Sequence, residues 1–436
     1  MGPVRTFFVQ NFGCRASQAD GVAVEGLLSG AGLVAAKRAH ADLVVLNTCT
    51  VTASADDDLR QTVRRVHREN AAARILVTGC YAQRAPDEIA ALPGVAWVVG
   101  NSHKAHIAEL VSSEEYHGQV HVGDIFAPHD FLSAAAGGAH TRPTLKIQDG
   151  CDNRCSFCII PFVRGRSRSA PLGQVLQQVR ELSRTNREVV LSGINLGRWG
   201  RERGAGSMRL ADLVRAILRE TEIERLRLSS VEPMDFSDDL LQLMANSTRI
   251  ARHVHAPLQS GSDAVLRRMR RKYRARHYAD RIFKARSAMP EAAIGADVMV
   301  GFPGETDEEF ERSREFIAGM PFTYLHVFTY SSRPGTPAAD APDQVPVVVR
   351  RERNRILRQL ADSKNLDFRK RMVGKRLLAV TLNSPYTAMS DNYLNIELTK
   401  PLPRNQLIEV EIGSVTESGL RQASTTPGGL RVLSTS

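Results

Sequence analysis

The sequence has no apolar stretch long enough to cross a lipid bilayer, which takes about 20 consecutive apolar residues. Its first residues, MGPVRTFFVQNFGC, also lack the apolar segment and the small-residue cleavage site of a secretory signal. These absences argue against a membrane-spanning or secreted protein. We therefore expect a cytoplasmic protein with no membrane partner.

The sequence contains few cysteines, and this small number limits the disulfides and metal sites that they could form. Persistent disulfides are rare in the reducing cytoplasm, so cysteines at regular spacings there indicate metal binding or catalysis. The 436 residues contain six of them, Cys14, Cys49, Cys80, Cys151, Cys155 and Cys158.

Acidic residues are outnumbered by basic ones, 47 against 58, which gives a formal net charge of +11. Such an excess favours a polyanionic partner, such as nucleic acid, over a small acidic substrate alone. The length also exceeds what one hydrophobic core usually supports, so we expect two or three domains.

The first part of the chain predicts a parallel α/β fold. Residues 1–116 alternate short apolar runs, such as RTFFVQ and ADLVVLN, with helical patterns near residues 18–30 and 55–70. Strands separated by helices indicate a parallel sheet. Residues 117–141, rich in glycine, alanine and histidine, are predicted to be a linker.

A second alternation of strands and helices fills residues 142–368. Six such units predict a partial (β/α)6 barrel with its chemistry at the carboxyl ends of the strands. Short β-patterned runs then predict a small all-β barrel over residues 369–436. The expected strands of the central barrel are residues 144–149, 187–193, 225–230, 253–258, 293–301 and 323–330.

The segment CDNRCSFC places Cys151, Cys155 and Cys158 directly after the first strand of the barrel. Iron–sulfur cubanes are normally held by four thiolates, so a triplet without a fourth cysteine nearby leaves one iron open to a substrate. The alternative is a structural zinc site, which usually closes with a fourth cysteine or histidine. No histidine lies between Gly150 and Arg252.

The other three cysteines are far apart in sequence but share a position. Cys14, Cys49 and Cys80 each follow a predicted strand, in NFGC, LNTC and VTGC. The carboxyl ends of parallel strands lie along one edge of the sheet, where such folds bind ligands. We therefore predict a second three-cysteine cluster, against the alternative of three unrelated buried thiols.

With these motifs, the sequence resembles a known family along nearly its whole length. The C-x3-C-x2-C loop is similar to the signature of the radical S-adenosylmethionine (SAM) superfamily, and the added N-terminal triplet resembles the methylthiotransferases. The resemblance implies three domains, at 1–116 (methylthiotransferase domain), 142–368 (radical SAM core) and 369–436 (TRAM domain).

Flanking motifs are most similar to the branch that acts on N6-threonylcarbamoyladenosine at position 37 of tRNA. These motifs are NTCTVTASAD, SSVEP, VGFPGET and HVFTYSSRPGTPAA. Two alternatives stay open: a sister branch acts on isopentenyladenosine at the same position, and another on an aspartate of a ribosomal protein. Family members commonly carry asparagine where this chain has Ser17.

The resemblance also implies the cofactors and partners. Two 4Fe–4S clusters are expected, one of which binds SAM and cleaves it to a 5′-deoxyadenosyl radical that abstracts hydrogen from C2 of the adenine. The other supplies sulfur, methylated by a second SAM. The implied partners are the tRNA anticodon stem-loop, an electron donor such as a flavodoxin or ferredoxin, and a sulfur donor.

Five residues near strand ends or the cysteine loop are candidate SAM contacts. Phe157 is expected to stack on the adenine of SAM or, alternatively, to pack in the core. Gly193 lets the backbone approach a ligand closely. Asn195, Ser230 and Glu232 bring polar groups to the barrel mouth, although Glu232 could instead pair with an arginine.

Three basic runs are expected to include phosphate contacts. They span residues 164–169, 267–276 and 350–376, and the last run leads into the terminal domain with Arg369, Lys370, Arg371 and Lys375. The usual alternative for such runs is a solvated surface.

Overall fold

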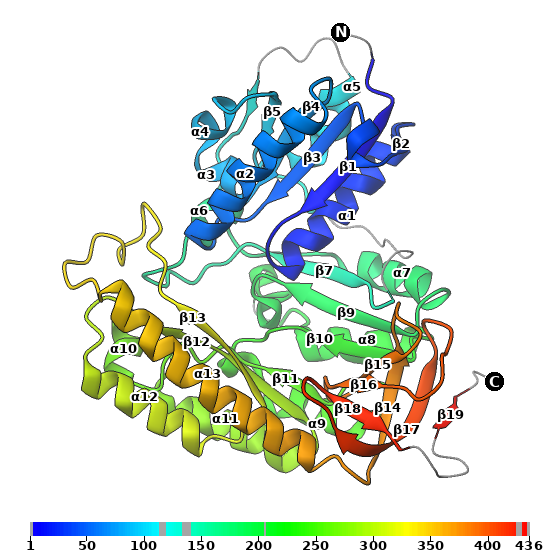
Figure 1. Ribbon diagram of the computed structural model, residues 1–436, viewed down its shortest axis with the longest axis vertical. Coiled ribbons are helices and arrows are strands. Elements are labelled where there is room, and N and C mark those ends of the chain that lie inside the picture. Colours follow the sequence, from blue (N-terminus) through cyan, green and yellow to red (C-terminus); the bar gives the residue numbers. More distant parts are fainter. Residues whose placement is uncertain (1–2, 113–118, 133–140, 205, 424–429, 434–436) are drawn as a thin grey trace.

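The N-terminal part of the chain folds as a six-stranded sheet, parallel throughout, in the order β2-β1-β3-β4-β5-β6 (Figure 1). The structure is a computed structural model that describes residues 3–112, 119–132, 141–204, 206–423 and 430–433. The elements of this part are β1 (Thr6–Asn11), α1 (Arg15–Gly30), β2 (Val34–Ala35), β3 (Leu43–Thr48), α2 (Ala53–Glu69), β4 (Arg74–Gly79), α3 (Cys80–Arg84), α4 (Pro86–Ala90), β5 (Val95–Val99), α5 (Ile107–Ser112) and β6 (Val120–His121).

The central strands of this sheet are apolar because helices cover both faces. Strand β3 is buried at every position, as expected for a parallel strand with no solvent-facing side. Strand β6 pairs with β5 inside the range predicted as a linker, so the sheet extends further than expected, and residues 133–140 lie outside the described residues. The predicted domain boundaries stay predictions.

The central part is an open arc of six parallel strands in the order β7-β9-β10-β11-β12-β13, with β8 antiparallel to β7. Its elements are β7 (Thr144–Asp149), α6 (Ile160–Arg164), β8 (Arg168–Ser169), α7 (Leu172–Ser183), β9 (Glu188–Gly193), α8 (Leu210–Glu220), β10 (Arg225–Leu228), α9 (Asp238–Asn246), β11 (His253–His255), α10 (Asp263–Arg268), α11 (Ala275–Ala288), β12 (Ala293–Val300), α12 (Asp307–Gly319), β13 (Tyr324–Thr329) and α13 (Val347–Lys370).

Helices cover the outer face of this arc with amphipathic surfaces. In α8 the buried residues Leu210, Leu213, Val214 and Ile217 recur at helical spacing and pack into the main core. Helix α12 begins at a capping box, in which Thr306 and Glu309 bond each other's backbone amides. The motif VGFPGET thus forms the turn between β12 and α12.

The C-terminal part is a closed β-barrel. Strands β14-β15-β16-β18-β17 form a ring, because β17 pairs antiparallel with β14, and β19 adds to β17. The fold class predicted from the sequence is therefore confirmed. The strands are β14 (Arg376–Thr381), β15 (Thr387–Ser390), β16 (Asn395–Glu397), β17 (Leu407–Val415), β18 (Leu420–Gln422) and β19 (Leu430–Val432).

A buried ionic network joins the N-terminal domain to the arc. Asp20 of α1 pairs with Lys104 (3.1 Å), Arg164 (3.0 Å) and Lys146, and Asp149 pairs with Lys146 (2.9 Å) and Arg164 (3.0 Å). All five side chains are at most 7% exposed. Burial opposes the ionisation of Asp20, but the three cations outweigh it and hold the pKa of this carboxyl below its usual range.

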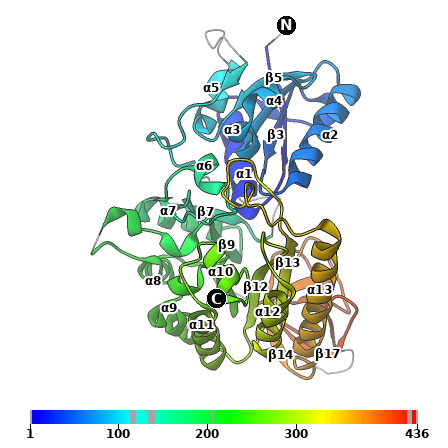
Figure 2. The ribbon, with the colours of Figure 1, turned by 90° about the vertical axis from the view of Figure 1, so that its left-hand side faces the viewer.

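The loop after β13 makes a second connection between the same two domains. It rises from the arc to the start of α2, where Arg333 pairs with Asp56 at 2.8 Å and Ser331 accepts a hydrogen bond from the amide of Ala53 (Figure 2). Both ends of the arc, β7 and β13, are thus tied to the N-terminal domain.

The terminal barrel docks against the arc at the amino-terminal half of its strands. Arg227 of β10 is fully buried, pairs with Glu188, and donates to the carbonyls of Ser390 and Asp391 at 3.0 Å each. Because four hydrogen bonds to Glu188 and the two carbonyls satisfy this guanidinium, its burial depends on the terminal barrel being in place.

The basic tail does not present all of its charge to solvent. Arg369 is 8% exposed and donates to the carbonyls of Thr416 and Glu417, while Lys375 pairs with Glu291. Arg369 thus holds the turn after β17, whereas the Lys375 side chain is 42% exposed, and the expectation that these two side chains contact phosphates stays a prediction. In the described part of the chain, no helix is both long and apolar enough to span a membrane.

Replacing Asp20 with asparagine should lower the free energy of unfolding by about 3–5 kcal/mol at neutral pH, because Lys104 loses its carboxylate partner while Lys146 and Arg164 keep only Asp149. Folding lowers the pKa of Asp20 below its usual value of 3.8, so the ionised carboxyl stabilises the folded protein at pH values above 3.8. This contribution is lost as the pH falls below that value. Between pH 5 and about pH 3, the free energy of unfolding should therefore decrease less in Asp20→Asn than in the parent protein. Denaturant unfolding at several pH values measures both effects.

The matched control is Asp57→Asn, which breaks an exposed pair with Arg60 on α2. Exposed ion pairs contribute about 0–1 kcal/mol, so this variant should unfold like the parent. Equal losses in the two variants would show that the buried network does not hold the domains together.

Candidate active site

The loop after β7 carries the first cysteine triplet. It begins at Gly150, whose φ of +68° and whose missing Cβ are both required, since an added Cβ would lie 2.0 Å from the carbonyl oxygen of Arg166. The amide of Cys151 then donates to the carbonyl of Gly165, and the amide of Cys158 to that of Cys155. This tight turn brings the three thiols together.

Residues from the opposite side of the arc hold this loop in place. Both the amide and the hydroxyl of Ser156 donate to backbone carbonyls at the end of α10. Arg271 lies 3.4 Å from Cys155 Sγ and pairs with Glu232, while Asn195 Nδ2 lies 3.7 Å from Cys151 Sγ. Burial, with the neighbouring cysteines, raises the pKa of Cys158 to about 12, so these thiols need a cation to ionise.

The second triplet lies at the carboxyl edge of the N-terminal sheet. Cys14 precedes α1, Cys49 follows β3, and Cys80 follows β4. Gly13 packs so closely on Cys49 that an added Cβ would lie 2.8 Å from its Sγ, at a φ of +93°. Burial first, then the neighbouring Cys80 and Cys14, raise the pKa of Cys49 to about 12. The prediction that these distant cysteines converge is supported by the close approach of Gly13, the neighbour of Cys14, to Cys49.

Arg164 connects this triplet to the interdomain network. Its Nε lies 3.3 Å from Cys80 Sγ, while its other nitrogens bond Asp20, Asp149 and the hydroxyl of Ser17. Ser17, where the family commonly has asparagine, also lies 3.6 Å from Cys14 Sγ. The same cation therefore positions the domains and lies beside the sulfur ligands.

The spacing of the sulfurs fits clusters better than single ions. A tetrahedral zinc ion, with Zn–S bonds of about 2.3 Å, keeps its sulfurs within about 4 Å of one another. Among the described residues, neither triplet has all its sulfurs within 4.8 Å of one another. Three thiolates in each set, with no fourth cysteine in the chain for either, are compatible in number with a cubane that keeps one iron open.

The five candidate SAM contacts lie in three places. Asn195 and Glu232 reach the cysteine loop through Cys151 and Arg271, and Oδ1 of Asn195 is buried without a hydrogen-bond partner. Gly193 ends β9 so close to Gln148 that an added Cβ would lie 2.9 Å from the Cβ of that side chain. Ser230 lies one layer deeper and hydrogen-bonds His255 at 2.6 Å.

Phe157 turns away from the open side of the loop into an apolar cluster. Its ring meets Phe302 edge to face at 6.4 Å, and Val265 and Met269 belong to the same cluster. This is the core packing given as the alternative from sequence. Its expected role against the adenine of SAM stays a prediction.

Sequence reasoning missed the residues that orient the site. Arg271 and Arg164 lie in two basic runs expected to contact phosphate, but they are buried and point at cysteines. Gln148, which accepts a hydrogen bond from the amide of Asn195 at 2.6 Å, follows an ordinary strand pattern. No local signal distinguishes these arginines from the exposed ones beside them, because their partners are distant in sequence.

Comparison with known families matches the two cysteine-bearing regions separately. Residues 145–317 match the Radical SAM superfamily, and residues 6–100 match the Uncharacterized protein family UPF0004. Among solved structures, the chain is similar to the radical S-adenosylmethionine methyltransferase TsrM from Kitasatospora setae, with a TM-score of 0.58 and 16% identity. The similarity covers 78% of this chain and 77% of TsrM, and it shows the fold alone.

Several curated proteins are similar over most of the chain. Threonylcarbamoyladenosine tRNA methylthiotransferase MtaB from Rickettsia prowazekii is 34% identical over 95% of this chain and 96% of its own length. The protein of that name from Bacillus subtilis is 42% identical, over 74% of this chain and 72% of its own length. A tRNA-2-methylthio-N(6)-dimethylallyladenosine synthase from Mycobacteroides abscessus is 37% identical, over 86% and 76%. With two cysteine triplets on a radical SAM fold and relatives of this length and identity, the chain belongs to the methylthiotransferase family of radical SAM enzymes.

Proposed function

We propose that this enzyme inserts a methylthio group at C2 of N6-threonylcarbamoyladenosine at position 37 of tRNA. The observation that carries the proposal is the pair of cysteine triplets, one in each domain, connected across the interface by the buried network around Arg164. Relatives named for this reaction are 34–42% identical to the chain. The enzyme uses two 4Fe–4S clusters and SAM.

The two triplets divide the work. Cys151, Cys155 and Cys158 would hold one cluster and leave one of its irons open to SAM, and Cys14, Cys49 and Cys80 would hold the second. When bound, these groups supply hydrogen abstraction at C2 and the sulfur that replaces the hydrogen. The cation of Arg271 beside Cys155 and that of Arg164 beside Cys80 offset the thiolate charge in each site.

Polar groups of the arc orient SAM between the clusters. Asn195 offers as an acceptor its Oδ1, which has no hydrogen-bond partner among the described residues, and Glu232 offers a carboxylate already held by Arg271. Gly193 lets Gln148, which holds the amide of Asn195, pack directly against the end of β9. Ser230 contributes its hydroxyl, and Phe157 supports the loop from behind. A flavodoxin or ferredoxin supplies electrons, a separate donor restores the sulfur, and the reaction takes place in the cytoplasm.

A groove along α2 offers contacts for the anticodon stem-loop. Arg64, Arg65 and Arg68, in the last turns of α2, line this groove of about 500 Å³ together with Asp58 and with Phe12, two residues before Cys14. In the described part of the chain, none of these arginines forms an ion pair, whereas Arg369 and Lys375 of the basic tail are occupied. Free cations along α2 suit the phosphates that flank the target base.

Methylthiolation of dimethylallyladenosine is the second candidate, supported by relatives of 36–37% identity named for it. Mass spectrometry of tRNA nucleosides from a deletion strain separates the two. Loss of the 2-methylthio form of threonylcarbamoyladenosine is the expected result, and loss of only the dimethylallyl form would refute the proposal.

Anaerobically reconstituted protein should contain about eight irons and eight sulfides per chain, because each triplet holds one cubane. Cys155→Ala should lose one cluster and all reductive cleavage of SAM. Cys49→Ala should lose the other cluster, keep SAM cleavage and form no methylthio product. Iron analysis, electron paramagnetic resonance and product assays measure these results, and loss of SAM cleavage in both variants would contradict the division of work.

Replacing Arg65 or Arg68 with glutamine should weaken tRNA binding and make it less sensitive to salt. Each lost contact to a single-stranded phosphate should reduce the log–log slope of affinity against salt by about 0.7. Binding titrations at several salt concentrations measure the slope. Arg184→Gln, an exposed arginine after α7, is the matched control. The groove is not the RNA contact if all three variants keep the parent slope.

A further inference from the structure

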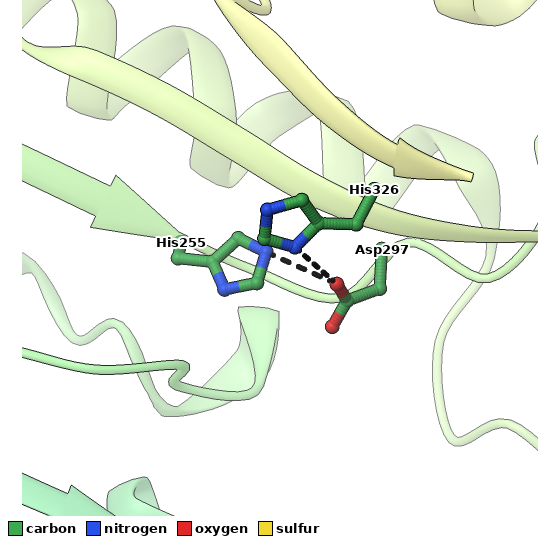
Figure 3. A group of neighbouring side chains, drawn as sticks. All are labelled: His255, Asp297 and His326. Carbon is green, nitrogen blue, oxygen red and sulfur yellow. Dashed lines mark hydrogen bonds and ion pairs between the residues drawn. The ribbon is translucent and has the colours of Figure 1, made fainter. Parts of the chain in front are cut away.

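A cluster of three ionisable side chains occupies the inner face of the arc, apart from both cysteine triplets. We call His255, Asp297 and His326 the lumen cluster (Figure 3). Both imidazoles approach the same oxygen of the Asp297 carboxylate, and the three side chains come from the adjacent strands β11, β12 and β13. Their nearest nitrogens and the carboxylate oxygen all lie within 4.8 Å of one another.

Strand alternation places this cluster inside the arc. The intervening residues Val254, Ala296 and Val327 belong to the main core, which packs them against the covering helices. Successive side chains of a strand point to opposite faces, so the lumen cluster faces inward. Register confirms the match, because Asp297 pairs with His326 across β12 and β13.

The contacts within the cluster leave nitrogens available to a ligand. His326 bonds Oδ1 of Asp297 through Nδ1 at 3.2 Å, and His255 bonds the hydroxyl of Ser230 through Nδ1 at 2.6 Å. Nε2 of His255 lies 3.3 Å from the same oxygen but makes no proper hydrogen bond there. Nε2 of His326 has no partner among the described residues, and this side chain is 49% exposed.

Asp297 is ionised in this position. Burial opposes its ionisation, but the two adjacent imidazoles, His255 and His326, outweigh it and hold the pKa of the carboxyl below its usual range. A carboxylate that accepts the Nδ1 proton of a histidine fixes the orientation of the ring. With Nδ1 directed at Asp297, Nε2 is the nitrogen of His326 left for a ligand, and it donates to an anion when the ring is protonated.

An aromatic layer closes the space on the far side of the cluster. The rings of His253 and Tyr324 stack 6.0 Å apart, and Tyr393 of the terminal barrel lies 4.6 Å from His253. Tyr324 lies over Gly295, where an added Cβ would be 2.0 Å from its ring. On the near side, Ser230 and Glu232 lead to the SAM-binding loop, so the lumen cluster lies between that loop and a closed floor.

We propose that the lumen cluster binds the threonylcarbamoyl arm of the substrate, with His326 donating from Nε2 to the threonine carboxylate. This proposal rests on the proposed function, because it explains how the enzyme would select threonylcarbamoyladenosine. C2 and C6 flank N1 in adenine and their substituents diverge, so C2 can face the radical while the N6 arm extends inward. A dimethylallyl arm has no group that could use these donors, and burying them unpaired is unfavourable.

The test compares three anticodon stem-loops with cluster-loaded, full-length enzyme. One carries threonylcarbamoyladenosine, the second its carboxamide analogue without the charge, and the third dimethylallyladenosine. The parent should prefer the carboxylate over the carboxamide. His326→Phe should lower kcat/KM for the carboxylate substrate about 10- to 100-fold, as expected for a lost hydrogen bond to a charged group, and change the carboxamide little. His326→Gln, which keeps one donor, should lose less.

His40→Phe is the matched control, because His40 is an exposed histidine of the N-terminal domain. It should keep the parent preference, and all variants should keep the parent iron content and SAM cleavage without substrate. An unchanged carboxylate preference in His326→Phe, or equal losses on both analogues, would overturn the proposal.

Two further results would also overturn the proposal. A parent enzyme that acts on the dimethylallyl substrate alone would refute the proposed function with it, whereas activity on threonylcarbamoyladenosine with no effect of His326 would refute only the subsite. Equilibrium dialysis against Mn²⁺ and Zn²⁺ would reveal a cation site instead, if one ion per chain binds to the parent and not to His326→Phe.

Discussion

The burial of Asp20 and Asp149 against Lys104, Lys146 and Arg164 constrains the rest of the molecule. Each domain pairs part of the network itself, Asp20 with Lys104 and Asp149 with Lys146 and Arg164, and docking adds the pairs from Asp20 to Lys146 and Arg164. Charges buried in a low-dielectric interior cost several kcal/mol each unless they are well paired, so these added pairs matter. The network therefore specifies one docking of the N-terminal sheet on the arc, with α1 against β7 and β9. Arg164 extends this constraint to the chemistry, since the same guanidinium reaches Cys80. Two cysteine triplets that fold in separate domains are in this way held in one relative position.

The sequence was sufficient where a feature depends on local pattern. Strands β7 and β12 follow from their apolar runs, and the Cys151 loop follows from its spacing. The convergence of Cys14, Cys49 and Cys80 also followed, because parallel strands end at one edge of a sheet. Features that depend on distant partners could not be predicted. The run at 267–276 does not show that Arg271 pairs with Glu232, and the tail does not show that Arg369 is taken up by carbonyls of β17 and its turn. The residue type alone does not distinguish an arginine that becomes buried from one that stays in solvent.

The arc differs from an ordinary barrel in what fills it. Its outward-facing residues are apolar and pack under the helices, whereas its inner face carries Arg227, Glu188, His253 and the lumen cluster. An inner face with so much polar surface cannot be closed by simple packing. The terminal barrel resolves this at the amino-terminal half of the strands, where its carbonyls receive Arg227 and its Tyr393 covers His253. The carboxyl half stays open to ligands, beneath the N-terminal domain.

The cysteine loops and the lumen cluster occupy different levels of the arc. The cysteines sit on loops at the strand ends, attached by backbone hydrogen bonds and two buried arginines, and none of these contacts involves His326. The lumen cluster sits within strands whose backbone pairing does not depend on the identity of inward side chains. Substitutions there can therefore change which N6 arm is accepted while the ligands of both clusters stay in place. The cluster chemistry can stay constant while the accepted base changes, because the cysteines lie on loops at the strand ends and the lumen cluster consists of side chains within the strands.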